Sequence, residues 1–266
     1  MAEKINVWTY WHSEERPEIV NHCIESWRQQ LDSDRFRINI VSENNLSDYL
    51  SPEWINQIPN FQDLEIANQA DFIRLSLLKF HGGIWLDATI YLLRDLSFIP
   101  DFNKFYAPRI LFLDTRTVQV FFLVAPKNDY IVSEWLKLYT NILKQDDHLE
   151  FKWYRINFYA LSKTFRIYFQ IYLAYASLHR TDSVFRKNTP KRKQYDAKLI
   201  VNMRNAVKLL KIVVLQKLEM HEKVYEVWNK EQSPSLTLTK NNEIIFYKIN
   251  EFDRQSVEMI RPWAET

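Results

Sequence analysis

Four polar residues in one short stretch have the types and spacing of a ligand-binding site. Asp71 and Arg74 are three residues apart in a segment with helical periodicity, so their side chains face the same way. Asp87 and Thr89 follow a short apolar segment, and two residues apart on extended chain they point to the same side. The sequence therefore predicts that an Arg–Asp pair and an oxygen-rich pair converge on one ligand crevice.

The segments that must position these side chains alternate between strand and helix. Apolar periodicity predicts strands at 5–11, 36–41 and 84–86, and helices at 17–30 and 70–80. This β-α-β-α-β order is typical of a mostly parallel sheet covered by helices. Ligands of such sheets bind outside the carboxyl ends of the strands, which is where Asp87 is placed.

The later part of the chain is predicted with fewer strands. Residues 105–108 and 118–125 are strand candidates, 133–144 is predicted helical, and 244–249 is predicted as a late strand. From about residue 151 the segments are long, aromatic, basic and mostly helical in pattern. We therefore predict an α/β domain over 1–130 and a mostly helical, basic subdomain over 131–266.

The two glycines of the chain are adjacent, Gly82 and Gly83, and they separate the predicted helix from the predicted strand. Average proteins contain about 7% glycine. A chain that makes its other turns without glycine is expected to need backbone freedom at this point.

Composition and charge limit the class of protein. Cys23 is the single cysteine, which excludes an internal disulfide or a multi-cysteine metal cluster and fits a cytoplasmic location. No apolar stretch is long enough to span a bilayer, and no secretory signal is visible at the N-terminus. Residues 151–217 hold 15 Lys or Arg against two Asp or Glu, which indicates an anionic partner such as a phospholipid surface, a lipid pyrophosphate or nucleic acid.

The stretch NQADFIRLSLLKFHGGIWLDATI at 68–90 resembles the sugar-nucleotide motif of the DXD glycosyltransferase family, which includes mannosyltransferases and large glucosylating toxins. It is more similar still to the bacterial capsular polysaccharide synthesis family, in which GG-x-W-x-DAT is the usual form. The opening VWTYWHSEERPEIVNHCIESW, the ENN loop at 43–45 and SPSLTLTK at 233–240 resemble other elements of that family. The resemblance implies a GT-A, Rossmann-like fold and transfer of a hexose from a UDP-sugar with retention of configuration.

The resemblance also implies roles for individual residues. Trp11 would stack on the uracil and Asn45 would hydrogen-bond its edge, whereas Trp8, on the opposite side of the strand, is expected in the core. Asp71 and Arg74 would hold the hydroxyls of donor sugar and ribose, and Asp87 would contact ribose, sugar and a divalent ion, Mn²⁺ or Mg²⁺. The remaining implied donor contacts are Tyr10, Ala70, Trp85 and Thr89, with Thr89 also a metal ligand beside Asp87.

The chain departs from the usual pattern of the wider family at two positions. Thr89 stands where the DXD motif has its second aspartate, and a hydroxyl is a poorer metal ligand than a carboxylate. Val120 stands where the wider family has an asparagine that helps to recognise the sugar. A basic residue of the C-terminal half is an alternative to the metal ion.

Structural roles account for each residue taken singly: a surface ion pair for Asp71 and Arg74, a turn for Asp87, a helix cap for the glycines. Their joint order and spacing favour a binding site. We expect a glucosyl- or galactosyltransferase of capsular or exopolysaccharide synthesis, acting on a lipid-linked saccharide at the cytoplasmic face of an anionic membrane. The alternatives are a non-catalytic nucleotide-sugar-binding or assembly subunit and, ranked low because no reading motif is present, a nucleic-acid-binding module.

Overall fold

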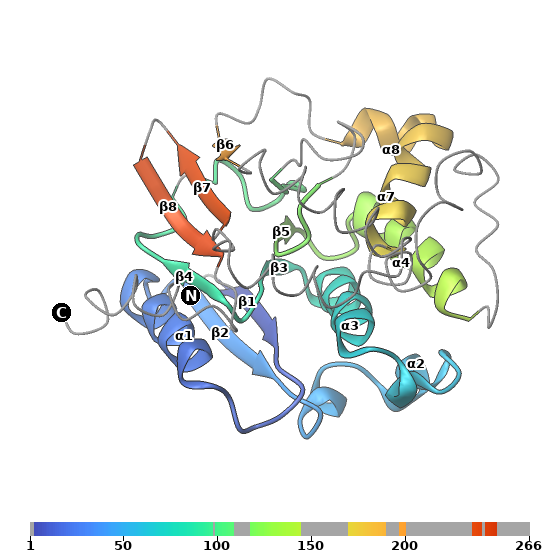
Figure 1. Cartoon of the computed structure of the whole chain (residues 1–266). Helices are drawn as coiled ribbons and strands as arrows, with labels where there is room; N and C mark the ends of the chain where they lie inside the picture. The colour runs from blue at the N-terminus through green and yellow to red at the C-terminus, as the bar shows by residue number, and fades with distance from the viewer. Residues whose placement is uncertain are drawn as a thin grey trace, which may run out of the picture.

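The computed structural model describes residues 3–97, 99–108, 118–144 and 170–189, together with the backbone of three strands at 197–200, 236–240 and 243–248. Figure 1 shows a central sheet with helices on both sides and a second group of strands beside it.

The central sheet contains β1 (Ile5–Tyr10), β2 (Phe36–Val41), β3 (Gly83–Leu86) and β5 (Phe122–Ala125), in the order β2-β1-β3-β5. β1 pairs in parallel with β2 and β3, and β5 is antiparallel to β3. The strands are short and rich in Val, Ile and aromatic residues, as expected for strands buried on both faces. The predicted fold class, a Rossmann-like α/β domain with a mostly parallel sheet, is confirmed.

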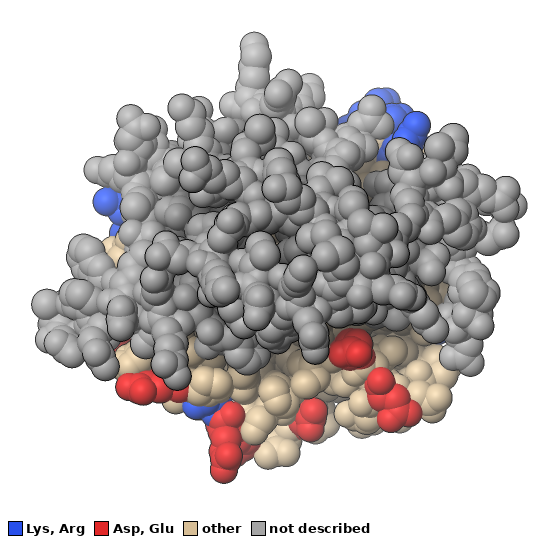
Figure 2. Space-filling view, in the orientation of Figure 1, with Lys and Arg blue, Asp and Glu red and all other residues tan. Residues whose placement is uncertain are grey.

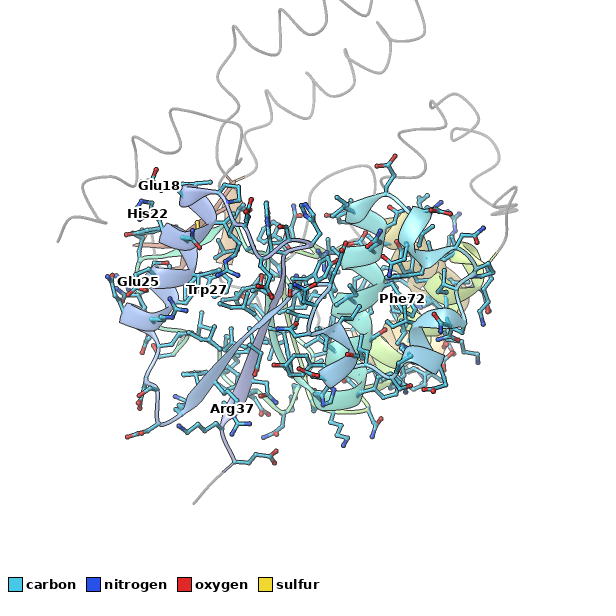
Figure 3. All side chains as sticks on the ribbon, turned by 90° about the horizontal axis from the view of Figure 1, so that it is seen from below. Glu18, His22, Glu25, Trp27, Arg37 and Phe72 are labelled. Atoms are coloured by element: carbon cyan, nitrogen blue, oxygen red, sulfur yellow. The ribbon has the colours of Figure 1, made fainter. Side chains whose placement is uncertain are left out.

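Alternate residues of the strands supply two hydrophobic layers. On one face Val7 and Ile84 pack with α1 (Glu18–Gln30), and on the other face Trp8 and Trp85 pack with α3 (Ile66–His81). The expected core position of Trp8 is thereby confirmed. Figure 3 shows the outer face of α1 with Glu18, His22 and Glu25, while Trp27 lies on the side toward the sheet. Between β2 and α3 the chain forms α2 (Pro52–Asn56) and two 3-10 turns, Leu46–Asp48 and Phe61–Asp63.

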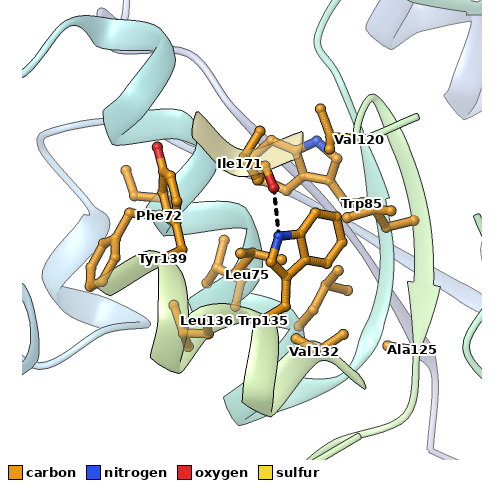
Figure 4. Close-up of a cluster of buried hydrophobic side chains, with 14 of the residues drawn as sticks. Phe72, Leu75, Trp85, Val120, Ala125, Val132, Trp135, Leu136, Tyr139 and Ile171 are labelled. Carbon is orange, nitrogen blue, oxygen red and sulfur yellow. Dashed lines mark hydrogen bonds between the residues drawn. The ribbon is translucent and has the colours of Figure 1, made fainter. Parts of the chain in front are cut away.

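Three helices extend the layer on the α3 side: α4 (Tyr130–Leu143), α7 (Gln170–Thr181) and α8 (Ser183–Asn188). Trp135 and Tyr139 of α4 are fully buried, and the Trp135 indole donates to the Ile171 carbonyl at 2.8 Å (Figure 4). One hydrophobic cluster thus runs from the sheet through α3 to α8. The domain boundary at residue 130 stays a prediction.

The second sheet joins distant parts of the chain. β4 (Ile90–Leu92) pairs with β8 (Glu243–Lys248), followed by β7 (Leu236–Lys240) and β6 (Ala197–Ile200), all antiparallel. The predicted late strand is confirmed as β8. Most of the predicted basic helical segment at 151–217 lies outside the described residues.

Both glycines occupy backbone conformations that favour glycine. Gly82 has φ 67° and Gly83 has φ 107°, in the region that L side chains rarely adopt. A Cβ at Gly83 would overlap the Asn6 carbonyl oxygen of β1, and one at Gly82 would lie 2.5 Å from the Lys127 amide nitrogen. The predicted need for backbone freedom is confirmed, and it lets α3 turn directly into β3.

Candidate functional site

The carboxyl end of β3 carries the predicted site in a turn. The Asp87 amide donates to the Phe121 carbonyl at 2.9 Å, which keeps Asp87 beside β5, and the Ile90 amide donates back to the Asp87 carbonyl at 2.9 Å. The chain therefore bends between Asp87 and Ile90, and the expectation that Asp87 and Thr89 share one side of an extended chain is wrong. Thr89 is only 2% exposed.

Arg74 joins two carboxylates from different elements. Its Nη1 lies 2.8 Å from Asp71 Oδ1, one turn earlier on α3, and its Nη2 donates to Asp87 Oδ1 at 2.9 Å. Asp71 and Arg74 are buried, whereas the Asp87 side chain is 21% exposed and forms the accessible end of the group. The structure thus brings together the Arg–Asp pair and Asp87, as the sequence predicted. We call Asp71, Arg74 and Asp87 the carboxylate–arginine cluster.

The Asp71–Arg74 contact is an ion pair without good hydrogen-bond geometry. Arg74 Nη1 and Nε find no hydrogen-bond partner in the described part of the chain, although both atoms are buried. Buried donors of this kind are costly unless they are satisfied. The Arg74 guanidinium thus places a buried positive charge between Asp71 and the partly exposed Asp87 side chain.

Trp85 lies beneath the cluster. Its indole N–H donates to Asp87 Oδ1 at 2.8 Å, and the Arg74 guanidinium carbon stands 4.9 Å from the centre of its ring. The side chain is 1% exposed and packs in the core layer on the α3 side. Trp85 therefore contacts two members of the cluster from the protein interior.

Burial controls the electrostatics of the cluster. It raises the pKa of Asp71 to about 7; the charge of Arg74 opposes this shift and that of Asp87 adds to it. The pKa of Arg74 is raised by the two carboxylates despite its burial, so Arg74 stays charged. With one guanidinium shared by two carboxylates, Asp71 is the group that exchanges a proton near neutral pH.

Two tyrosines from later helices lie near the cluster and were not predicted from the sequence. The pKa of Tyr139 on α4 is raised well above its usual value by burial and by Asp71, and Tyr172 on α7 interacts electrostatically with Arg74. Asn68 on α3 donates to Gln170 on α7 at 3.4 Å. Nothing local in α4 or α7 indicates this proximity, because it follows only from the packing of those helices on α3.

The carboxyl end of β1 carries two more predicted residues. Tyr10 faces the α3 side, as Trp85 does; its pKa is raised to about 12 by burial and by Glu43, and its hydroxyl has no hydrogen-bond partner among the described residues. Trp11 is half-buried just beyond the strand, with its ring centre 5.6 Å from that of His12. Since β1 and β3 are parallel neighbours, both residues lie at the same edge of the sheet as Asp87.

Asn45 and Ala70 are the remaining predicted contacts of the sugar donor. The Asn45 amide oxygen accepts from the Ser42 amide at 2.8 Å, and its nitrogen donates to the Ile40 carbonyl at 3.1 Å, so this side chain holds its own loop. Ala70 is half-buried on α3, next to Asp71.

The described residues contain no group of three His, Cys, Asp or Glu side chains arranged to hold a metal ion. At the predicted metal position, Asp87 supplies one carboxylate, and one of its oxygens already receives Arg74 and Trp85. Mg²⁺ is commonly held by one or two carboxylates with substrate phosphates and water. The residues therefore fit an ion that depends on a bound diphosphate and do not fit an all-protein metal cage.

A surface hollow of about 360 Å³ lies elsewhere, along α1 and the exposed side of β2. It is lined by charges of both signs, including Arg16, Glu25 and Arg28, and it shares no residue with the carboxylate–arginine cluster. We therefore do not assign it to the predicted ligand.

The fold and the cluster define an α/β protein with a mostly parallel central sheet and a polar site at the carboxyl end of a central strand. The chain belongs to the family of capsular polysaccharide synthesis proteins, whose profile matches residues 1–234.

Two curated fungal proteins are similar to parts of the chain. O-glycosyltransferase braB of Annulohypoxylon truncatum is 28% identical over 160 residues, covering 52% of this chain and 37% of the relative. O-glycosyltransferase PaGT of Phomopsis amygdali is 26% identical over 107 residues, covering 36% and 26%. The chain thus spans between about a quarter and two fifths of the length of these relatives.

A solved structure, PaToxG Glycosyltransferase, is similar over 69% of this chain and 73% of its own, with 11% identity and a TM-score of 0.44.

Proposed function

We propose that the protein is a glycosyltransferase that moves a hexose, glucose or galactose, from a UDP-sugar to a lipid-linked saccharide in capsular or exopolysaccharide synthesis. The observation that carries the proposal is the carboxylate–arginine cluster at the end of β3, with Asp87 as its exposed member. Membership of the capsular polysaccharide synthesis family and the names of the two curated relatives support the same class of reaction.

The donor would lie along the edge where β1 and β3 end. Trp11 would stack on the uracil, a contact that contributes about 1–3 kcal/mol for a base on an aromatic ring. The resemblance assigns Asp71 and Arg74 to the hydroxyl groups of sugar and ribose, and in the structure the two side chains join Asp87 in one cluster at the end of β3. Asp87 would contact the ribose, the sugar and an ion on the diphosphate.

The chemistry requires stabilisation of the departing diphosphate. A Mn²⁺ or Mg²⁺ ion would supply a positive charge there when bound, with Asp87 as its protein ligand. Arg74 keeps a permanent positive charge at the same strand end. We propose transfer with retention, in which the acceptor hydroxyl attacks on the face that UDP leaves and its proton passes to the leaving phosphate.

The described part of the basic segment supports membrane attachment. Arg180, Arg186 and Lys187 are exposed on α7 and α8, and Figure 2 shows basic side chains over this corner of the molecule. Val184 beside them is 49% exposed. No helix among the described residues is long and apolar enough to cross a bilayer. We infer that a peripheral contact with anionic lipid brings the site to a lipid-linked acceptor on the cytoplasmic side.

A thermal-shift panel of nucleotide sugars, combined with an assay of UDP-sugar hydrolysis, tests the proposal. A ligand at 100 times its Kd adds about 2.7 kcal/mol to the free energy of unfolding. We expect UDP-glucose or UDP-galactose to raise the melting temperature and to be hydrolysed slowly without acceptor. Stabilisation without hydrolysis or transfer would instead indicate the alternative, a non-catalytic nucleotide-sugar-binding subunit. No stabilisation by any nucleotide sugar would reject both.

A further inference from the structure

The role of Trp85 differs from the one implied by the sequence. The resemblance placed this residue among the donor contacts, but its side chain is 1% exposed and lies in the core layer between the sheet and α3. Its polar contact is directed at the Asp87 carboxylate instead.

Two hydrogen-bond donors, an indole and a guanidinium, contact the same oxygen of Asp87. Asp87 Oδ1 accepts from the Trp85 indole at 2.8 Å and from Arg74 Nη2 at 2.9 Å. The same indole ring lies 4.9 Å from the Arg74 guanidinium carbon, within the range of a cation–π contact. Trp85 therefore contacts both members of the Asp87–Arg74 pair, one through its N–H and one through its ring.

The backbone of Trp85 is held on both sides. In the sheet it stands opposite Trp8 of β1 and Leu123 of β5, and its ring is 1% exposed in the core layer on the α3 side. Asp87 is already outside β3, in the turn that ends at Ile90. The hydrogen bond from the buried indole therefore restricts the position of the Asp87 carboxylate, although Asp87 itself lies in a turn outside the sheet.

We propose that Trp85 is a positioning residue, whose indole fixes the Asp87 carboxylate and the Arg74 guanidinium relative to each other before the donor binds. This inference rests on the proposed function, in which Asp87 and Arg74 contact the donor. Transfer enzymes depend on groups that are held in place in advance, because a group that must reorganise during the reaction stabilises the transition state less. The indole N–H suits this task, since it adds a hydrogen bond to the carboxylate without a further charge.

The first experiment is a double-mutant cycle on turnover. Trp85→Phe keeps an aromatic ring and removes the N–H. We expect it to lower the rate of UDP-sugar hydrolysis about ten-fold, the size expected for one hydrogen bond to a charged group, with the Kd for UDP changed less than two-fold. In the Asp87→Ala background, which has no acceptor for the indole, the same substitution should have no further effect on the rate, because Trp85 acts through Asp87.

Trp135→Phe is the matched control. Trp135 is also buried and belongs to the same hydrophobic core layer as Trp85. Its indole donates to the backbone carbonyl of Ile171 and not to a carboxylate of the site. We expect the control to lower the melting temperature and to leave the hydrolysis rate unchanged. If Trp85→Phe behaves in the same way as this control, or slows the Asp87→Ala variant ten-fold as well, the positioning role is rejected.

The second experiment does not depend on activity. In a ¹H–¹⁵N spectrum the indole resonance of Trp85 is identified as the one that disappears in Trp85→Phe. Asp87→Asn should shift this resonance more than any other indole resonance of the protein, because it changes a charged acceptor into a neutral one. An unmoved resonance would overturn the proposal. A wild-type protein that neither hydrolyses nor transfers would reject the proposed function, and the resonance would then decide alone whether Trp85 holds Asp87.

Discussion

Arg74 and Asp87 are 13 residues apart in the chain, on different elements, and their side chains meet at 2.9 Å. The contact ties the middle of α3 to the turn after β3, and the adjacent glycines between the two elements make this return possible. Removing one partner of a buried ion pair typically costs about 3–5 kcal/mol, because the other charge is left uncompensated. Here Asp71 remains beside Arg74 if Asp87 is changed, so the site tolerates a substitution at its exposed end.

The first prediction concerns Asp87→Asn. We expect turnover to fall by roughly 10²-fold or more, which is the loss typical for a preorganised electrostatic group. The folded structure should persist, since the amide oxygen still accepts from Trp85 and Asp71 still neutralises Arg74. Rates of hydrolysis and transfer, measured beside far-ultraviolet circular dichroism, provide the check. A variant that transfers at nearly the wild-type rate would remove Asp87 from the site.

The second prediction concerns pH and Asp71. Its pKa in the folded protein is about 7, above the usual value, so between the two values the native state binds more protons than the unfolded state. The free energy of unfolding should therefore fall as pH rises from about 4 to 7 through this group, and Asp71→Asn should remove that part of the slope. Melting temperatures of both proteins between pH 5 and pH 8 test this.

The matched control for that series is Asp101→Asn. Asp101 is a partly exposed carboxylate whose pKa is lowered by hydrogen bonds from Lys104 and Asn103, so its titration acts in the opposite direction and at lower pH. Between pH 5 and pH 8 its substitution should leave the slope unchanged. Equal slopes for wild type and Asp71→Asn would mean that Asp71 is already ionised across this range.

How far the sequence predicts the structure depends on the range of the interaction. Periodicity within the first 90 residues is sufficient for β1, β2 and β3, for α1 and α3, and for the shared face of Asp71 and Arg74. It did not predict β4, a three-residue strand whose partner β8 lies far along the chain. The turn at Asp87–Ile90 was missed because residues 87–90 lack glycine and proline. The sequence predicts the apolar strand that contains Trp85 but not the contacts of its indole with Asp87 and Arg74, because those depend on how α3 packs on the sheet.

The third prediction concerns Trp11, which lies half-buried beyond the end of β1. If its ring stacks on the uracil, Trp11→Ala should weaken binding by about 1–3 kcal/mol. The loss should be equal for UDP, UDP-glucose and UDP-galactose, because all three contain the same base. Calorimetric titration with the three ligands measures it. A loss that depends on the attached sugar would mean that Trp11 contacts the hexose.

The fourth prediction concerns the metal ion. The described residues offer a single carboxylate at the predicted metal position, and that carboxylate is already paired with Arg74, so the protein alone should bind Mn²⁺ weakly. We expect Mn²⁺ alone to leave the melting temperature unchanged, and Mn²⁺ with UDP to raise it more than UDP alone. Mg²⁺ and chelator serve as the parallel arms. A rise with Mn²⁺ alone would indicate a protein cage that includes ligands other than Asp87 and Thr89.

The last prediction concerns the membrane. Arg180, Arg186 and Lys187 are exposed on α7 and α8, with Val184 exposed between them. Each basic residue near an anionic surface contributes about 1 kcal/mol, so replacing all three with Gln should weaken binding to phosphatidylserine vesicles roughly a hundred-fold. The control replaces Arg28, Lys104 and Lys137, three exposed basic residues on other elements, and should bind as the wild type does. Sedimentation with neutral and anionic vesicles, at low and raised salt, separates charge from other causes. Binding that does not depend on lipid charge and salt, or that is lost equally in both triple variants, would contradict attachment through this corner. The basic residues on α7 and α8 would then be expected to contact the acceptor directly.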